Sequence, residues 1–462
     1  MNTTISLVRR VLFFGALAAF ALTSRAQVVE LRATINAAQE FPTASTSPAT
    51  GSAIMLYDVA ANTFDLIVTI NDFANTASAS HIHEAAAGAA GSVVTNLGAD
   101  AVYTRAGNTL RATFRGVTHG GDKLKLLQGQ AYFNIHSAAY PGGEVRGQLI
   151  AQPKRLVSNF TVAQEQAAQP QLNLAGLNDF GGAVMFYDPV ANRVSLRLSI
   201  YNFNNTFNNS HYHEGAPGVS GGVVTNLGNN SNAGGYTTAN GHISGTFDIP
   251  YTGDPIKLLT GGAYLNFHSS TFGPGELRGQ VFASDEVPST RFSNLSVRGF
   301  VGNGEQVLIQ GIAVNGPEPI RALITAKGPW LSGFGVANAL ANPRLALFDS
   351  GGRQIAVNDD IGPIASGSDL SITPGIPTNP LESALIVVLP PGNYTAIVSG
   401  NGGTGIGILE VTDMRNAGLR ATASTVEQSM VYNLERSKAR SGAKPAVELC
   451  EAGPVSLAMV AR

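Results

Sequence analysis

Apolar and polar residues alternate along much of the chain, which is the pattern of β-strands that bury one face in a core. The clearest alternating segments are 31–36, 53–58, 63–70, 183–188 and 193–200. A helical period is weak everywhere and is strongest in the short run Lys123–Leu127. The turn-like residues 59–62 join two of the strands. We therefore predict an all-β chain of antiparallel β-sandwich or Greek-key barrel domains.

The most informative pattern is that one set of motifs occurs twice. Each copy contains His-x-His-Glu, then V-V-T-N-L-G, then an aromatic run that ends in a third histidine, and then G-E-(V/L)-R-G-Q. The histidine pairs begin at His81 and His211, an offset of 130 residues that V-V-T-N-L-G shares, and the third histidine and the closing motif are offset by 132. Tyr57-Asp58 and Tyr187-Asp188 match at the offset of 130 as well. A duplicated unit of this length is a domain rather than a solenoid repeat.

This repeat divides the chain into consecutive parts. We predict a signal peptide at 1–26, repeated domains at 27–152 and 156–284, a third β-sandwich at 291–413, and a tail at 414–462. Residues 153–158 and 285–290 are the expected joints. For the tail we predict a short helix at Thr425–Lys438 and otherwise disorder.

In the third domain, strands are expected at 307–314, 321–326, 344–350, 384–389 and 394–400. D-S-G-G-R, from Asp349, predicts a hairpin turn. The glycine-rich segment 400–411 lacks the strand-turn-helix context of a phosphate-binding loop, so we interpret it as a glycine-rich hairpin.

The N-terminal segment has the pattern of a secretory signal. Arg9 and Arg10 precede a short apolar run, Val11–Leu22, and small residues predict cleavage before Gln27. The alternative is an uncleaved membrane anchor, but the run is shorter than the roughly 20 residues that a spanning helix needs. We therefore expect an exported protein, periplasmic, at the cell surface or extracellular. Cys450 is the single cysteine, so an internal disulfide is excluded.

Composition narrows the possible partners. Charged residues make up only 13% of the chain and the formal net charge is −2. This balance gives no basic surface for a nucleic acid, and the scattered lysines and arginines form no polybasic membrane patch. After signal cleavage we expect no transmembrane segment. The partner classes left open are a protein, a glycan or another cell-surface ligand.

The repeated histidines are candidate metal ligands. Residues two apart on a strand share a face, so His81 and His83 project together, as do the matching pair of the second copy. The third histidine of each copy lies on the polar side of its own strand. Three imidazoles in such an arrangement suit Zn²⁺ or Cu²⁺. The predicted ligands are His81, His83, His136, His211, His213 and His268.

Acidic and arginine residues accompany these histidines in both copies. The predicted members of a structural polar cluster are Glu84, Glu144, Arg146, Glu214, Glu276 and Arg278. An arginine can hold a carboxylate through two hydrogen bonds, and a histidine beside such a pair can be hydrogen-bonded as well. One alternative to a metal site is therefore a buried hydrogen-bonded cluster that includes the histidines. A further alternative is catalysis by a glutamate beside the paired histidines. His119 and His242 have dissimilar surroundings in the two copies, and we interpret them as surface residues.

At these motifs the sequence resembles the CHRD (chordin-type) domain family, which is widespread in bacterial exported proteins. H-I-H-E-A-A-A-G, H-Y-H-E-G-A-P-G and the two G-E-(V/L)-R-G-Q closures carry the resemblance. A-Q-E-F-P from Ala38 resembles the family's usual start, whereas the second copy reads A-Q-E-Q-A-A, so its first strand is expected to be irregular. The resemblance implies tandem β-sandwiches and no defined activity. The third domain resembles a glycine-rich β module of bacterial secreted proteins.

Three functions remain open from the sequence. The first is an exported, non-enzymatic protein whose tandem domains bind a ligand, including a metal ion. The second is a purely structural spacer. The third is a metal enzyme similar to copper-zinc superoxide dismutase, which also places His-x-His on a β-strand. Against the enzyme, each copy offers three histidines where that family uses four for copper, and its zinc loop and disulfide have no counterpart here.

Overall fold

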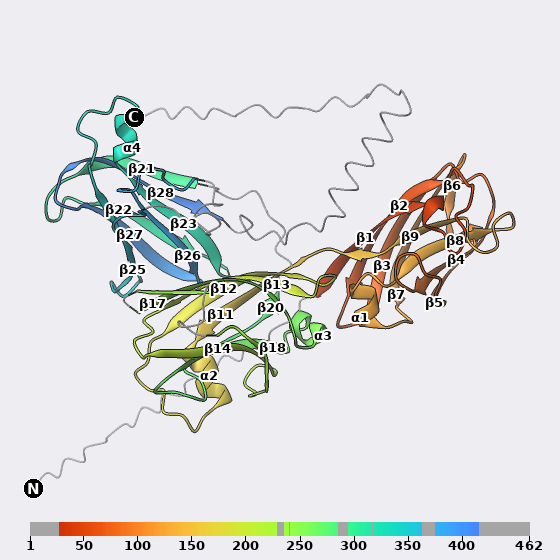
Figure 1. Cartoon of the computed structure of the whole chain (residues 1–462), viewed down its shortest axis with the longest axis horizontal. Coiled ribbons are helices and arrows are strands. Elements are labelled where there is room, and N and C mark those ends of the chain that lie inside the picture. The colour runs from red at the N-terminus through yellow and green to blue at the C-terminus, as the bar shows by residue number, and fades with distance from the viewer. Residues whose placement is uncertain are drawn as a thin grey trace, which may run out of the picture. The chain divides into compact units, whose positions relative to one another are not determined.

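The chain is an all-β protein with tandem domains, as the sequence predicts. A computed structural model describes residues 27–228, 235–239, 241–284, 294–316, 318–362 and 375–414 (Figure 1). Each domain is described below by itself.

The first domain is one curled antiparallel sheet of ten strands. Its strands are β1 (Val28–Asn36), β2 (Thr50–Asp58), β3 (Thr63–Asn71), β4 (Ala77–Glu84), β5 (Ser92–Gly98), β6 (Thr104–Ala106), β7 (Thr109–Thr118), β8 (Tyr132–Ser137), β9 (Val145–Gln148) and β10 (Ile150–Ala151). Hydrogen bonding connects them in the order β5-β4-β8-β9-β1-β2-β3-β7-β6, and β10 pairs with β1. Two 3-10 turns, Ala37–Gln39 and Asp100–Val102, and the helix α1 (Lys123–Leu127) complete the domain.

The second domain repeats this sheet strand for strand. Its elements are β11 (Lys154–Thr161), α2 (Val162–Ala168), β12 (Phe180–Asp188), β13 (Arg193–Tyr201), β14 (Phe207–Glu214), β15 (Val223–Asn226), β16 (Tyr236–Ala239), β17 (His242–Pro250), α3 (Pro255–Leu259), β18 (Ala263–Ser269), β19 (Leu277–Gln280) and β20 (Phe282–Ala283). The strand order is β15-β14-β18-β19-β11-β12-β13-β17-β16, with β20 on β11. The duplicated sequence therefore encodes a duplicated topology.

The predicted alternation places the core on the concave side of each sheet. In β1 the side chains of Leu31 and Ile35 are fully buried, whereas that of Arg32 is 61% exposed. The helix α1 coincides with the short helical run expected at the same residues, and an aspartate, Asp122, caps its N-terminus by accepting from two backbone N–H groups.

The third domain consists of two four-stranded antiparallel sheets. One has the order β21-β28-β23-β26 and the other β22-β27-β24-β25. The elements are β21 (Asn294–Val301), β22 (Leu308–Val314), β23 (Ile320–Lys327), α4 (Pro329–Ser332), β24 (Pro343–Phe348), β25 (Gln354–Asn358), β26 (Ser383–Leu389), β27 (Gly392–Gly400) and β28 (Gly405–Asp413). The turn predicted from Asp349 joins β24 to β25 as a hairpin.

Three local predictions were wrong. The glycine-rich segment 400–411 is not a hairpin, because β27 and β28 belong to different sheets and the turn between them carries the chain across. The first strand of the second copy is regular, since β11 pairs with β12 without a break in register. The two copies differ after that strand, where the second has α2 in place of a 3-10 turn. Most of the joint expected at 153–158 is part of β11.

Other predictions concern residues that lie outside the described ranges. These are the signal peptide at 1–26, the joint at 285–290, the tail helix at Thr425–Lys438 and Cys450. Across the part of the chain that the structure does describe, no helix combines the length and the apolar character needed to cross a bilayer.

Candidate metal centre

Strand register brings the three histidines of the first domain to one face of its sheet. In the pairing of β4 with β8, His83 lies opposite Tyr132, and His136 lies opposite Ala79. His81 is two residues before His83 and points to the same side. The intervening Ile82 is fully buried in the core. The histidines therefore occupy the outer, convex face.

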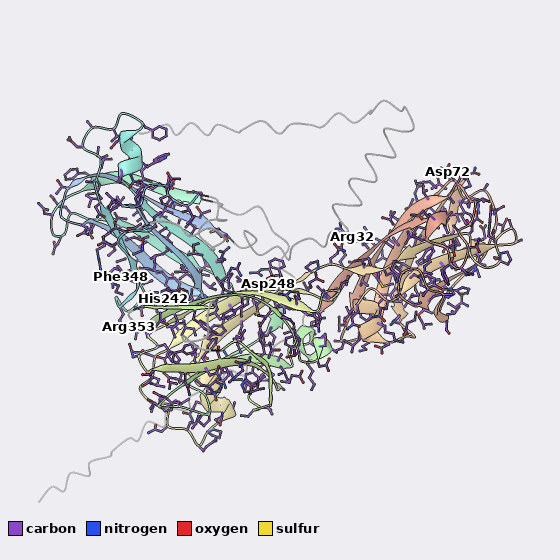
Figure 2. The ribbon with its side chains drawn as sticks, in the orientation of Figure 1. Arg32, Asp72, His242, Asp248, Phe348 and Arg353 are labelled. Carbon is purple, nitrogen blue, oxygen red and sulfur yellow. The ribbon has the colours of Figure 1, made fainter. Side chains whose placement is uncertain are left out.

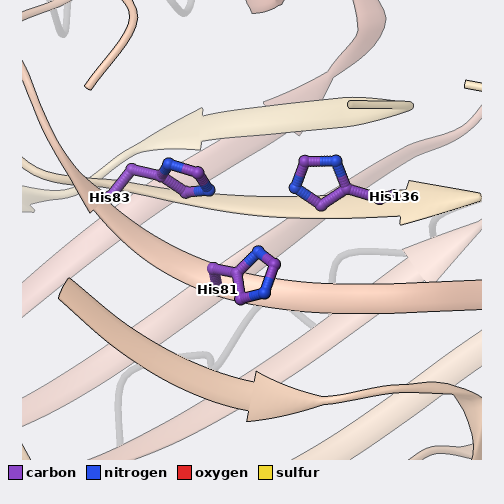
Figure 3. A group of neighbouring side chains, drawn as sticks. All are labelled: His81, His83 and His136. Atoms are coloured by element: carbon purple, nitrogen blue, oxygen red, sulfur yellow. The ribbon is translucent and has the colours of Figure 1, made fainter. Parts of the chain in front are cut away.

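The three imidazole rings turn toward one another (Figure 3). Ring centroids are 5.4 Å apart for His81 and His83, 5.2 Å for His81 and His136, and 5.9 Å for His83 and His136. One nitrogen of each ring lies within 4.8 Å of a nitrogen of both others. Side chains 53 residues apart in the sequence thus converge on a single point.

The second domain repeats this geometry almost unchanged. Its ring centroids are separated by 5.5 Å for His211 and His213, 5.0 Å for His211 and His268, and 5.9 Å for His213 and His268. One nitrogen of each of these rings again lies within 4.8 Å of a nitrogen of both others. The structure therefore brings all six predicted ligands together as two groups of three.

Backbone carbonyls fix the protonation pattern of two rings in each group. His83 Nδ1 lies 2.9 Å from the Gly91 carbonyl oxygen, and His136 Nδ1 lies 3.0 Å from that of Pro141. A carbonyl only accepts, so each Nδ1 carries the hydrogen and each Nε2 of the neutral ring presents a lone pair. Both Nε2 atoms are buried without a hydrogen-bond partner, as is Nδ1 of His81.

The second group has the same arrangement with one difference. His213 Nδ1 and His268 Nδ1 donate to the carbonyls of Gly221 and Gly273 at 2.9 and 2.8 Å. His211 Nδ1, however, lies 3.1 Å from His268 Nε2, within hydrogen-bond distance. A metal ion at this site would replace that contact.

Burial favours the neutral form of five of the six rings. It lowers the pKa of His81 and of His83, and in the second domain it lowers the pKa of His211 to about 4 and that of His213 and His268 as well. The neighbouring imidazoles add to this effect at His81 and His211. Neutral imidazole is the form that binds a metal ion.

A stack of three planar groups supports His83 from behind. The Tyr132 ring lies parallel to it, with centroids 4.9 Å apart, and the Arg146 guanidinium lies 3.4 Å above the other face of Tyr132. Arg146 donates to the carbonyls of Ala89 and Ala86 at 2.7 and 3.1 Å and to the Gln148 side chain at 3.0 Å. These bonds hold the loop 85–91 over the site.

Gly91 completes this support, because its backbone makes two of the contacts. Its carbonyl accepts from His83, and its N–H donates to the Tyr132 hydroxyl at 3.2 Å. A side chain at this position would clash with the carbonyl oxygen of Glu84, so the loop requires glycine here.

The second copy builds the same support. Tyr264 stacks on His213 at 5.0 Å, and Arg278 lies 3.4 Å above Tyr264 and donates to two carbonyls of the loop 215–221. Gly221 takes the place of Gly91, and its N–H donates to the Tyr264 hydroxyl. The two loops differ at four of their seven positions, so the contacts are retained although most of the loop residues are not.

The acidic residues predicted for a polar cluster lie in separate places. Glu84 forms an ion pair with Lys125 at 2.7 Å, and Glu214 forms the matching pair with Lys257. Glu144 and Glu276 are buried. Glu144 accepts from Ser47 and Asn75, and Glu276 accepts from Asn205. The buried carboxyl behind Asn134 is instead that of Glu40, whose pKa burial raises to about 7.

The two remaining histidines are not surface residues as predicted. His119 is only 2% exposed and lies edge-on to Tyr57. His242 begins β17 (Figure 2), is half-buried and stacks on Tyr201 with ring centroids 5.0 Å apart. The alternating pattern did not predict the burial of either side chain, because His119 follows the last residue of β7 and His242 is the first residue of β17.

The donor set fits a transition-metal ion. Zinc-bound imidazole nitrogens lie about 2.0–2.1 Å from the ion, which sets them about 3.3 Å apart, and small rotations of the rings would bring them there from within 4.8 Å. Backbone acceptors on Nδ1 are the usual outer support of a ligating histidine. Each domain thus offers three imidazole nitrogens to one ion.

Comparison with known families agrees with the duplication of the domain. A family model described as the CHRD domain matches residues 31–149 and again 159–281, together more than half of the chain. The chain therefore belongs to the CHRD domain family, with two tandem copies. A search among curated proteins finds no match to it.

Proposed function

We propose that this is an exported, non-enzymatic protein in which each CHRD domain binds one transition-metal ion through three histidines. The single observation that carries the proposal is the convergence of three imidazole nitrogens in both copies, all of them unpartnered in the first copy and one in the second. Membership of the CHRD family favours a binding or structural role over an enzymatic one. The N-terminal pattern of Arg9, Arg10 and the apolar run supports export.

Buried polar atoms without hydrogen-bond partners are costly. An unsatisfied buried nitrogen costs about 1–3 kcal/mol, and three of them meet in the first domain. Coordination of a metal ion would satisfy all three at once. The second copy retains the same rings, stacks and carbonyl acceptors, which supports a shared ligand because they orient the three rings toward one point.

The chemistry of the donors favours zinc or copper. Imidazole is a ligand of intermediate softness that suits both ions, whereas Mg²⁺ and Ca²⁺ prefer oxygen. Within the described residues, each group contains three histidines and no cysteine, aspartate or glutamate. It is thus one histidine short of the copper site of superoxide dismutase, and no observation supports that alternative.

Metal analysis of the purified full chain tests the proposal. After loading with Zn²⁺ or Cu²⁺ and removal of free ion, we expect two ions per chain. His83→Ala and His213→Ala should each reduce this to one, and the double variant should bind none. His119→Tyr, which changes a histidine outside both groups, should retain two. Substoichiometric metal, or binding that survives the double variant, would overturn the proposal.

A further inference from the structure

We infer that each metal ion takes its fourth ligand from outside the domain, and that this ligand is an anion. The inference rests on the proposed metal site and concerns what that site would bind. Each group supplies three nitrogen donors, whereas zinc is almost always four-coordinate and Cu²⁺ takes at least four ligands. An open coordination position is therefore part of the site.

The charge of the site determines what fills that position. Imidazole binds a metal ion as a neutral ligand, so three histidines leave the charge of a divalent ion uncompensated. A fixed positive charge is also close, because Arg146 lies over Tyr132, and Tyr132 lies over His83. An anion is the ligand that such a site favours over a neutral one.

Carboxylates of the same domain are engaged elsewhere. Glu84 pairs with Lys125 and accepts from the Asp122 N–H. Glu144 accepts from Ser47 and Asn75. The carboxyl of Glu40 is held behind Asn134 and is not part of the group of converging ligand atoms.

Exposure shows from which side an external ligand enters. His83 is 8% exposed and covered by the loop 85–91, whereas His81 and His136 are half-buried. An external ligand would therefore reach the buried nitrogens from the side of His81 and His136. The second site is more closed, since His268 is 7% exposed. A small inorganic anion and the carboxylate of a partner share the required chemistry.

Cobalt substitution tests this inference, because the visible spectrum of Co²⁺ reports its coordination. The full-length chain is loaded with Co²⁺ in a sulfonate buffer with perchlorate as the background salt, and azide, acetate and acetamide are titrated separately. Acetate and acetamide have nearly the same shape and differ in charge. His213→Ala isolates the first site, and His83→Ala isolates the second.

We expect azide to change the spectrum saturably, and acetate to bind at least roughly tenfold more tightly than acetamide, which corresponds to about 1.4 kcal/mol. A response to acetate as well as azide supports a carboxylate ligand, and a response to azide alone supports a small inorganic anion. A Co²⁺ spectrum that is insensitive to azide, or equal affinities for acetate and acetamide, would overturn the inference. Failure to retain Co²⁺ at all would instead contradict the metal site itself.

Discussion

Replacement of Arg146 by methionine should release the loop 85–91 from the first domain and leave the second domain unchanged. Arg146 is 1% exposed, and its guanidinium makes three hydrogen bonds, two of them to loop carbonyls, besides stacking on Tyr132. Methionine fills similar space but donates nothing. The Ala89 carbonyl would then lose this donor, and the Ala86 carbonyl would keep only its bond from the Ala89 N–H.

The magnitude follows from these contacts. Hydrogen bonds to a charged group contribute about 1.5–3 kcal/mol each, and a cation–π contact contributes about 0.5–2 kcal/mol. Removing a buried cation also recovers part of its desolvation cost. We therefore expect a net loss of about 3–5 kcal/mol in the local stability of the first domain, which is more than a hundredfold in the opening equilibrium.

Hydrogen–deuterium exchange of the full chain measures this loss for each domain separately. Peptides covering 85–91 and β8 should exchange faster in Arg146→Met, while those covering 215–221 and β18 should not change. Arg278→Met is the matched control and should reverse the pattern. A change below about 1 kcal/mol, or equal changes in both domains, would refute the assignment of Arg146 as the support of the loop.

Two further predictions concern buried ionisable groups that differ between the copies. Burial lowers the pKa of His119, so the unfolded chain binds the proton more readily and stability falls as the pH drops below about 6.5. Tyr251 occupies the matching position of the second copy, and in His119→Tyr the melting temperature of the chain should depend less on pH over that range. Burial and a hydrogen bond to Glu276 raise the pKa of Asp179 to about 8. Its contribution to folding stability is therefore fully present below its unfolded pKa of about 4 and is lost as the pH rises to about 8. Asp179→Asn should have a higher melting temperature than wild type at pH about 8, and an unchanged or lower one would contradict the assignment.

The convergence of the histidines could be predicted from sequence because it depends on strand geometry alone. His81 and His83 share a face at any i, i+2 spacing, and the polar side of the A-Y-F-N-I-H run was evident from its alternation. The duplication indicated which histidines mattered. The observed pairing of β4 with β8 then places His136 beside them.

What covers that face could not be predicted, because alternation assigns a side chain to a face and not to a partner. Arg146 is on the expected side of β9, yet its partners are loop carbonyls, which leave no mark in the sequence. Gly91 and Tyr132 were the missed contributors. Their recurrence as Gly221 and Tyr264 at the repeat offsets was the available signal.

Turn chemistry was the other source of error. Glycine-rich segments mark a reversal of the chain, but the same residues serve a hairpin within one sheet and a connection between two. Residues 401–404 make the second kind, between β27 and β28. His119 was misplaced because it lies just beyond a strand, where alternation no longer constrains burial.

Anomalous diffraction from crystals of the zinc-loaded chain tests the central claim most directly. We expect one anomalous peak in each CHRD domain, about 2.0–2.1 Å from one nitrogen each of His81, His83 and His136, and likewise of His211, His213 and His268. Histidine groups that remain without a peak while zinc occupies only surface carboxylates would contradict the account.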